Sequence, residues 1–542
     1  MSNKKGNSFI KQAAILGAAG LLVRVIGILY RSPLTSIISD EGNGYYSSAY
    51  NIYAIILLIS SYSIPLAISK IISGKLALRE YRNAHRVFIS ALLYVVVVGG
   101  IASLFAFIGA PFLVESNSVP ALRVLAPTIF FSGLLGVLRG YFQAHSSMVQ
   151  TSLSQILEQL VNAIVSVLAA WLLTRAYVGG AAAYQVPIRG AQGGAMGTGA
   201  GVLTGLIFMF LMYLLNRSFF QRRLQRDKTE TLQSYPEIFK MILLMVTPVI
   251  LSTFIYNSVT AIDSTLYYKI MMYFKGWAQE KTAVQYGVFA TKYTTIINIP
   301  VALASSFSSA MIPGVSGSYE VGDLTTARSR INEAIRFTMI LCFPAMVGIG
   351  VLAYPIMLLL FPQPETIALA SNLLRVGCVC IIFYSLSTVT NAVLQGIGKV
   401  NIPMRNAALA LVVHLAVLVP LLFFTNWNLY ALLLGTAAYS LTMCVLNDLS
   451  VRKYLQYRLE VKKTLLLPAL SAGIMGVVTW ASYYGLRIAG LGNIISLGVS
   501  IVLSMLTYFV AILGTKTITE EELVRFPKGS VLIRLGKKLH LL

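Results

Sequence analysis

About fourteen runs of this chain are each long and apolar enough to cross a membrane, and several carry a charged side chain far from either end. A helix needs ~20 apolar residues to cross the ~30 Å hydrocarbon layer of a bilayer. An ionised side chain within that layer costs several kcal/mol, so it is expected to face the interior of the protein and to have a function. The pattern predicts an all-α integral membrane protein that presents positive charge to an anionic cargo.

The composition agrees with this class. Of the 542 residues, 57% are hydrophobic and only 11% are charged. A soluble domain carries about 25% charged residues, so a soluble enzyme is excluded. The net charge of +23 would suggest nucleic acid as a partner of a soluble protein, but cytoplasmic loops of membrane proteins collect Lys and Arg. We therefore expect membrane lipids as partners and no nucleic acid.

The apolar runs divide into two sets of seven expected spans. The first set is Phe9–Ser36, Gly44–Ser73, Ala84–Ala110, Val119–Ala144, Val149–Ala176, Gly190–Asn216 and Pro236–Ala261. The second set is Ala283–Pro313, Ala327–Leu352, Thr366–Gly396, Ile402–Phe424, Leu429–Ser450, Thr464–Leu486 and Asn493–Leu513.

The loops indicate an orientation. If the span count is right, most basic clusters fall on one side, which places both termini in the cytoplasm. These clusters are Lys4, Lys5 and Lys11; Lys75, Arg79, Arg82 and Arg86; Arg217, Arg222, Arg223, Arg226 and Lys228; and Arg452, Lys453, Arg458, Lys462 and Lys463. The loop with Lys269, Lys275 and Lys281 is an exception. The basic tail at 515–542 is expected to lie against the anionic inner leaflet.

Short matches suggest an internal repeat. Ile64-Pro65-Leu66-Ala67 in the second span corresponds to Ile299-Pro300-Val301-Ala302 in the eighth. Because six spans separate the copies, they have the same orientation, as in transporters with two parallel lobes. We expect an N-lobe at 1–220, a C-lobe at 221–455, two further helices at 456–514 beside a lipid-tail groove, and a central cavity between rocking lobes.

Two arginines in the first span are the first candidates for binding an anion. Arg24 and Arg31 are seven residues apart, so on a straight helix they point within about 20° of each other. Guanidinium groups bind phosphate through paired hydrogen bonds and stay charged in a dry site. Snorkelling toward the headgroups is the alternative for both residues.

Two further basic residues fall within later spans. Lys292 lies about nine residues into the eighth span, near ~13 Å at the rise of an α-helix. Arg375 lies at similar depth in the tenth. Both are candidate substrate-binding residues, and a buried ion pair within the helix bundle is the alternative for Lys292.

Acidic and polar residues provide candidates for gating or charge balance. Gln155, Glu158 and Asn162, together with Gln159, form one polar stripe on the fifth span. Glu158 is expected to relay a proton, hold a cation or balance an arginine, whereas a hydrogen-bonded seam to a neighbouring helix is the plainer reading. Asp263 at the outer end of the seventh span would neutralise a base, guard the outer gate, or simply end the helix.

The chain has no catalytic constellation and no Gly-rich phosphate loop of the ATPase type. We therefore expect no enzyme, no cofactor and no metal site. The energy for transport would come from the membrane potential or a monovalent cation.

Four segments resemble the MurJ and SpoVB branch of the multidrug/oligosaccharidyl-lipid/polysaccharide exporter superfamily. They are Leu22-Val23-Arg24-Val25-Ile26-Gly27, Ser63-Ile64-Pro65-Leu66-Ala67-Ile68-Ser69, Leu138-Arg139-Gly140-Tyr141-Phe142-Gln143 and Leu394-Gln395-Gly396. The resemblance implies a monomeric flippase of the bacterial cytoplasmic membrane for lipid II, an undecaprenyl-pyrophosphate precursor of peptidoglycan. It also implies that Arg24, Arg31 and Lys292 hold the pyrophosphate, and that cell-wall synthesis proteins are partners.

The chain departs from that family at three places. The second span has no arginine, Thr294 and Thr295 stand where an acidic residue is expected, and Ile402–Phe424 has no acidic residue for a sodium site. Three alternatives stay open: a flippase for another undecaprenyl-linked glycan, a multidrug/cation antiporter, and an accessory protein without transport.

Overall fold

The structure is a computed structural model of the chain. It describes residues 19–518, except 21, 63, 146, 228 and 230, and also residue 537. Regular structure in these residues is entirely helical, and they contain no strand. The expected all-α class is confirmed. The expectations for Lys4, Lys5 and Lys11, and for nearly all of the basic tail, fall outside the described residues.

The helices form two compact units, unit 1 (Met1–Thr291) and unit 2 (Lys292–Leu542). The chain passes from one to the other within a wide π-helical turn, η5 (Val288–Tyr293). The units differ from the expected lobes because α10 (Tyr235–Lys269) and α11 (Gln279–Gly287) pack on helices of unit 1. The lobe boundary at residue 220 stays a prediction from the sequence repeat.

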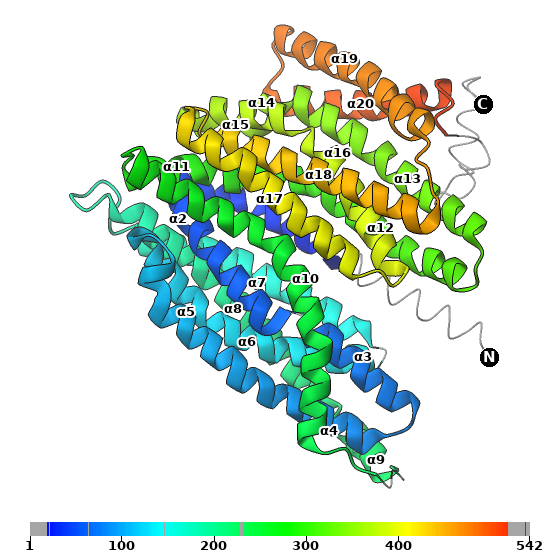
Figure 1. Ribbon diagram of the computed structural model, residues 1–542. Helices are drawn as coiled ribbons and strands as arrows, with labels where there is room; N and C mark the ends of the chain where they lie inside the picture. Colours follow the sequence, from blue (N-terminus) through cyan, green and yellow to red (C-terminus); the bar gives the residue numbers. More distant parts are fainter. Residues whose placement is uncertain are drawn as a thin grey trace. The chain divides into compact units, whose positions relative to one another are not determined.

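Unit 1 is a bundle of long helices joined by short turns (Figure 1). Besides α10, α11 and the helical residues 22–29, it contains α2 (Arg31–Leu57), α3 (Ile64–Ala77), α4 (Tyr81–Tyr94), α5 (Gly100–Leu113), α6 (Val119–Ala144), α7 (Met148–Thr174), α8 (Gln185–Leu215) and α9 (Arg217–Gln225). The turns η1 (Leu58–Tyr62), η2 (Val95–Gly99) and η4 (Ile270–Phe274) are π-helical, and η3 (Ser116–Ser118) is a 3₁₀ turn.

Glycines let α8 approach the backbone of α7 directly. A Cβ atom added to Gly193 would lie 2.4 Å from the backbone nitrogen of Ala170, and one on Gly201 would lie 2.5 Å from the carbonyl oxygen of Glu158. Gly197, between them, faces Ser166. Small residues spaced by four allow this close packing of membrane helices. The three glycines therefore let α7 and α8 pack closely along much of their length.

The loop expected between the first and second spans is a sharp kink inside α2. Ser39 has a left-handed φ of 64° with ψ 177°, so the helix on each side runs in a different direction. The buried side chain of Asn43 spans the kink, since its Nδ2 donates to Thr35 Oγ1 at 2.9 Å and to the Ser39 carbonyl at 3.0 Å. These bonds tie Thr35 and Ser39 to the part of the helix that follows the kink.

Unit 2 continues with helices of similar length. They are α12 (Thr294–Glu320), α13 (Leu324–Val351), α14 (Ala353–Leu360), α15 (Pro364–Gly377), α16 (Cys380–Gly396), α17 (Asn401–Phe424), α18 (Leu429–Leu455), α19 (Leu467–Ile488) and α20 (Asn493–Gly514), with a π-helical turn η6 (Lys462–Leu466) before α19. In Figure 1 the yellow α17 and α18 run side by side, as do α19 and α20.

Both units repeat one helix pairing. In unit 1, α3 packs on α6 where Gly140 lies against Pro65, and a Cβ on that glycine would be 2.7 Å from the Pro65 carbonyl oxygen. In unit 2, α12 packs on α16, where Ser316 Oγ donates to the Gly396 carbonyl at 2.7 Å. Because α3 and α12 carry the repeated sequence segments, each copy of the repeat packs on a helix that follows it in the same unit.

The helices fit a multi-pass membrane protein. Among the described residues, nine helices are long and apolar enough to span a membrane, or up to 11 if two bent pairs each count as one span. The two bent pairs are Leu22–Leu29 with Arg31–Ser61, and Pro364–Gly377 with Cys380–Gly396. The number fourteen stays a prediction.

Candidate functional site

The first candidate residues lie on either side of a bend. The helix at Leu22–Leu29 and the one beginning at Arg31 differ in direction by 47°. The straight-helix argument for aligning Arg24 with Arg31 therefore does not apply directly. Arg24 is exposed and Arg31 is half-buried.

Arg31 lies among tyrosines of α2. Its guanidinium group is close enough to the hydroxyl groups of Tyr46 and Tyr50 to interact with them electrostatically. Tyr46 also shares a hydrogen bond with Thr198 of α8 at 3.2 Å. The Tyr50 side chain is 39% exposed.

The same tyrosines approach Glu158 of α7. The carboxylate of Glu158 interacts electrostatically with the hydroxyl groups of Tyr50 and Tyr53. Arg31 and Glu158, both predicted from the sequence, thus belong to one polar cluster through Tyr50. We name Arg31, Tyr46, Tyr50, Tyr53 and Glu158 the tyrosine cluster.

The main partner of Glu158 is Arg139 of α6. Arg139 Nη2 donates to Glu158 Oε2 at 2.7 Å, and Arg139 Nε donates to Ser154 Oγ at 2.9 Å. The side chains are 15% and 28% exposed, respectively. Of the roles considered for Glu158, balancing an arginine matches this geometry.

The rest of the polar stripe on α7 lies against its neighbours. Asn162 Oδ1 accepts a hydrogen bond from Ser166 Oγ at 3.0 Å, close to the glycines of α8. Gln155 is half-buried. Gln159 faces Gly27, whose added Cβ atom would lie 3.3 Å from Gln159 Nε2. The stripe therefore contacts both α8 and the helix that carries Arg24.

Asp263 occupies a different part of unit 1. It is buried in α10 and interacts electrostatically with Tyr286 of α11. The Tyr286 hydroxyl accepts a hydrogen bond from Asn51 Nδ2 at 2.9 Å. Asp263 thus lies among polar groups where α2, α10 and α11 meet.

The two basic candidates of unit 2 differ in environment. Lys292 is 0% exposed, and its Nζ donates to Thr366 Oγ1 at 2.7 Å, beside the first turn of α15. The ring of Phe361 lies 6.0 Å from the same nitrogen. Arg375 is exposed at the last turn of α15, where its Nη1 lies 3.4 Å from Asn372 Oδ1. These two side chains therefore have separate surroundings within unit 2.

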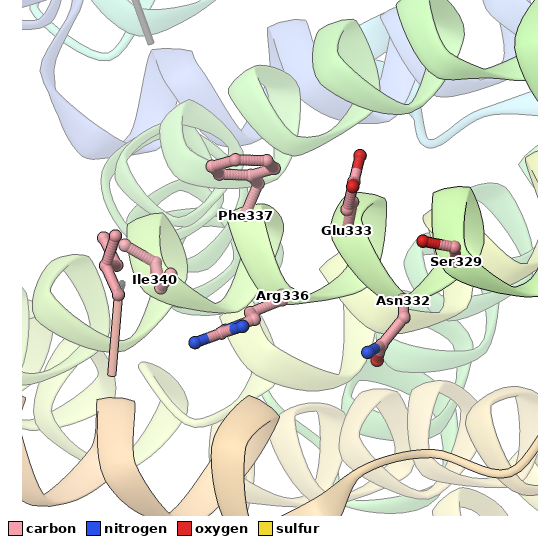
Figure 2. Close-up of a pocket in the computed structure, with 7 residues that line it drawn as sticks. Ser329, Asn332, Glu333, Arg336, Phe337 and Ile340 are labelled. Atoms are coloured by element: carbon pink, nitrogen blue, oxygen red, sulfur yellow. The ribbon is translucent and has the colours of Figure 1, made fainter. Parts of the chain in front are cut away.

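Unit 2 also contains a groove and a small pocket. An open, mostly apolar groove of about 500 Å³ lies between α19 and α20, lined by residues including Ile474, Leu506 and Val510. A pocket of about 120 Å³ follows α13. Figure 2 shows that Asn332 and Arg336 point to one side of α13 there, and Glu333 and Phe337 to the other.

The polar lining of the α13 pocket fastens neighbouring segments. Asn332 accepts a hydrogen bond from Tyr457 at 3.1 Å, and Arg336 donates to the Thr517 carbonyl. The segments that follow α18 and α20 are both held in this way. Asn332 and Arg336 therefore have structural partners in this pocket.

Sequence reasoning missed the tyrosines as site residues. Tyr46, Tyr50 and Tyr53 follow helical spacing on α2, and that periodicity was visible in the second span. The spacing could not indicate that the hydroxyl groups lie within electrostatic range of both Arg31 and Glu158, because the kink at Ser39 separates Arg31 from the tyrosines and Glu158 comes from α7.

Comparison with known proteins identifies the family. A family model described as "Polysaccharide biosynthesis protein" matches residues 9–318, which is more than half of the chain. The chain belongs to this family. A second model, MatE, matches residues 262–419.

Relatives place the chain more finely within this family. It is 23% identical over 490 residues to "Lipid II flippase MurJ" of Bacillus subtilis (strain 168), covering 87% of this chain and 88% of the relative. It is 22% identical over 533 residues to "Stage V sporulation protein B" of the same organism, covering 97% and 99%. The chain is a MurJ/SpoVB-type membrane transporter of the exporter superfamily, as the sequence resemblance predicted.

The fold of this family member agrees with a solved structure. "Lipid II flippase MurJ, inward closed conformation" matches with a TM-score of 0.64 at 14% identity, covering 94% of this chain and 100% of that one. The all-helical transporter fold predicted from the sequence is therefore confirmed.

Proposed function

We propose that this protein is a flippase that moves a lipid-linked peptidoglycan precursor, lipid II, from the inner to the outer leaflet of a bacterial membrane. The observation that carries the proposal is the polar group around Arg31 in unit 1. A permanently charged, half-buried guanidinium group lies there within electrostatic range of two tyrosine hydroxyl groups. Such a group suits a pyrophosphate, which arginine holds through paired hydrogen bonds.

Arg24 provides the second cationic group of this proposed site. It is exposed one turn before Gly27, where its helix passes the polar stripe of α7. Arg31 and Arg24 together would replace part of the water that a diphosphate loses on leaving the cytoplasm. Lys292 and Arg375 of unit 2 stay candidates for the same role. The buried ammonium of Lys292 already has a hydroxyl partner in Thr366.

The α19–α20 groove supplies a place for the lipid tail. Its lining is mostly aliphatic, and it is open along one side. Apolar surface of this kind suits an isoprenoid chain, because contact with apolar side chains keeps the chain out of water, as contact with lipid does. The headgroup would be moved while the tail stays in apolar surroundings.

The deciding experiment is transport of labelled lipid II in reconstituted vesicles. We expect Arg24→Ala and Arg31→Ala each to lower the flipping rate at least about tenfold, because each removes a charge that offsets desolvation of the diphosphate. Arg175→Ala is the matched control, since Arg175 stacks on Trp171 at the end of α7. Normal flipping by both variants, with folding intact, would reject the proposal.

Two alternatives keep specific support. The match to the MatE model favours a multidrug/cation antiporter, and the match to a sporulation protein leaves room for another undecaprenyl-linked glycan. Ethidium efflux from the same vesicles tests the first, and competition by other undecaprenyl-pyrophosphate glycans tests the second. Coupling to the membrane potential is testable here too, because each charge moved is worth ~2.3 kcal/mol per 100 mV.

A further inference from the structure

The turn between α10 and α11 carries aromatic side chains outside the helix bundle. Near the end of α10, Tyr267 and Tyr268 are fully buried. In η4, which continues this helix, Tyr273 is 77% exposed and Phe274 is 69% exposed. Within a short stretch of chain, the aromatic residues therefore change from core packing to the surface of unit 1.

The backbone gives this turn a defined shape. The Lys275 N–H donates to the Ile270 carbonyl at 3.0 Å, which closes the last π-helical turn. Gly276 follows with a left-handed φ of 66°. The Trp277 N–H then donates to the Met271 carbonyl at 2.9 Å. These bonds hold the chain in a compact turn, which presents the two exposed rings on one short segment.

Lysines accompany the exposed rings. Lys269, Lys275 and Lys281 lie in or beside the turn, and Glu280 is the only acidic residue between the first and the last of them. The Nζ of Lys281 lies 4.1 Å from the centre of the Trp277 ring. Lys281 is exposed and forms no ion pair with any residue that the structure describes. The segment therefore has an excess of positive charge beside apolar surface.

A hydrogen bond places this segment close to a membrane surface. Ser116 Oγ donates to Gln279 Oε1, at the start of α11, with a distance of 3.0 Å. Ser116 begins the span Ser116–Ala144 and closely follows the span Tyr81–Leu113, so it lies where the chain leaves the hydrocarbon layer. The turn that precedes Gln279 lies near the same surface, which is the outer one by the loop orientation expected from the sequence.

Exposed rings beside lysines suit the headgroup region of a bilayer. Tyr and Trp collect in that region because the ring is apolar while the hydroxyl or indole N–H stays hydrated. A lysine stem covers apolar surface while its ammonium group reaches toward phosphates. A soluble anionic partner would neutralise the lysines but would not need the rings. The positive charge also departs from the rule that Lys and Arg collect in cytoplasmic loops, so it calls for a ligand of its own.

We propose that residues 273–281 form an outer anchor, which binds the headgroups of anionic phospholipids in the outer leaflet. The two exposed rings enter the headgroup region, and the ammonium groups of Lys275 and Lys281 contact lipid phosphates. Trp277 holds Lys281 in place through its ring. Because the segment joins α10 to α11, the outer anchor fixes the depth of both helices at this surface.

Fluorescence quenching in reconstituted vesicles tests the outer anchor with the full-length protein. A brominated lipid quenches an indole ring that it contacts. The signal of Trp277 is obtained as the difference between wild type and Trp277→Phe, so the other three tryptophans stay in place. We expect brominated phosphatidylglycerol to quench this signal more than brominated phosphatidylcholine does. High salt should reduce the difference, because it screens charges at a surface.

The lysines are tested by a double variant, Lys275→Gln with Lys281→Gln. Its preference for phosphatidylglycerol should fall at least about fivefold, because each basic residue near an anionic membrane surface strengthens binding by about that factor. Lys399→Gln is the matched control, since Lys399 also lies against a ring, 5.3 Å from the centre of Tyr454 in unit 2. This control should keep the wild-type preference.

Three results would overturn the proposal. Absence of quenching by both lipids would place Trp277 outside the membrane. Equal quenching by the two lipids in wild type would remove the selection for anionic headgroups, and an unchanged preference in the double variant would remove the role of the lysines. None of these readouts uses cargo, so failure of the outer anchor leaves the flippase proposal standing, and the reverse also holds.

Discussion

In unit 1, glycines bring α7 and α8 into backbone contact and an ion pair joins α6 to α7, whereas in unit 2 side-chain amides join α16, α17 and α18. Asn447 Nδ2 donates to Asn391 Oδ1 at 2.7 Å, and Asn406 Nδ2 donates to Asn447 Oδ1 at 2.9 Å. Asn447 and Asn406 are buried, while the ion pair of unit 1 is partly exposed.

The difference separates two uses of polar groups within a membrane protein. A sealed amide network satisfies its own hydrogen bonds and fixes helix positions. An accessible charge cluster keeps some capacity to interact with something else. Unit 1 therefore holds the better candidates for cargo binding, and the network of unit 2 is assigned to stability.

The largest expected effect on stability is at the glycines of α8 that contact α7, which are Gly193, Gly197 and Gly201. Gly197→Ala should destabilise unit 1 by about 3 kcal/mol, because its Cβ atom would lie 1.9 Å from Ser166 Oγ and 2.6 Å from the Asn162 carbonyl oxygen. Trp171 fluorescence during thermal unfolding reports this. Gly100→Ala is the control, since nothing lies within 4 Å of its added Cβ and it should be neutral or slightly stabilising. If Gly197→Ala and Gly100→Ala unfold at the same temperature, the proposed backbone contact between α7 and α8 is contradicted.

A smaller loss is expected in the amide network. Asn447→Ala should lower the free energy of unfolding by about 2 kcal/mol, since it removes the donor to Asn391 Oδ1 and leaves Asn406 Nδ2 only its hydrogen bond to Ser450. All four cysteines lie in unit 2, so labelling of Cys444 by a thiol reagent during unfolding measures this unit alone. Asn372→Ala, at an exposed position, should leave labelling unchanged. The assignment of the network to stability fails if Asn447→Ala labels at the wild-type rate.

The smallest effect on stability is expected at the ion pair. Glu158→Gln should cost about 1 kcal/mol, because both side chains are partly exposed and Arg139 keeps Ser154. The double variant Arg139→Gln with Glu158→Gln should recover part of that loss, as chemical denaturation would show. If Glu158→Gln lowered the free energy of unfolding by more than Asn447→Ala does, the contrast between the two units would be reversed.

The sequence predicted the helical class, the family and most span positions because apolar runs of this length allow few other folds. Balancing an arginine was one of three roles considered for Glu158. The sequence could not show that the partner was Arg139, because helical spacing gives a face and leaves the neighbouring helix undetermined. The kink at Ser39 was equally hidden, since a serine with positive φ has no sequence signal.

Other differences come from packing between distant segments. Lys292 was expected to face a cavity, and its hydroxyl partner, Thr366, lies 74 residues away in sequence. The π-helical turn around Lys292 shifts side chains relative to a regular helix, so a fixed rotation per residue misplaces them. The anion-binding roles of Arg24, Arg31, Lys292 and Arg375 stay predictions.

Direct backbone contact between α7 and α8 limits how unit 1 can change shape. At the three glycines α8 contributes no side chain to the contact, so there is little there to rearrange when the unit bends or twists. Deformation would instead concentrate where helical geometry is already irregular, at Ser39 and in the wide turns η1 and η2. The pair α7–α8 would then move as one stiff element, and the first three spans would be the part of unit 1 that bends.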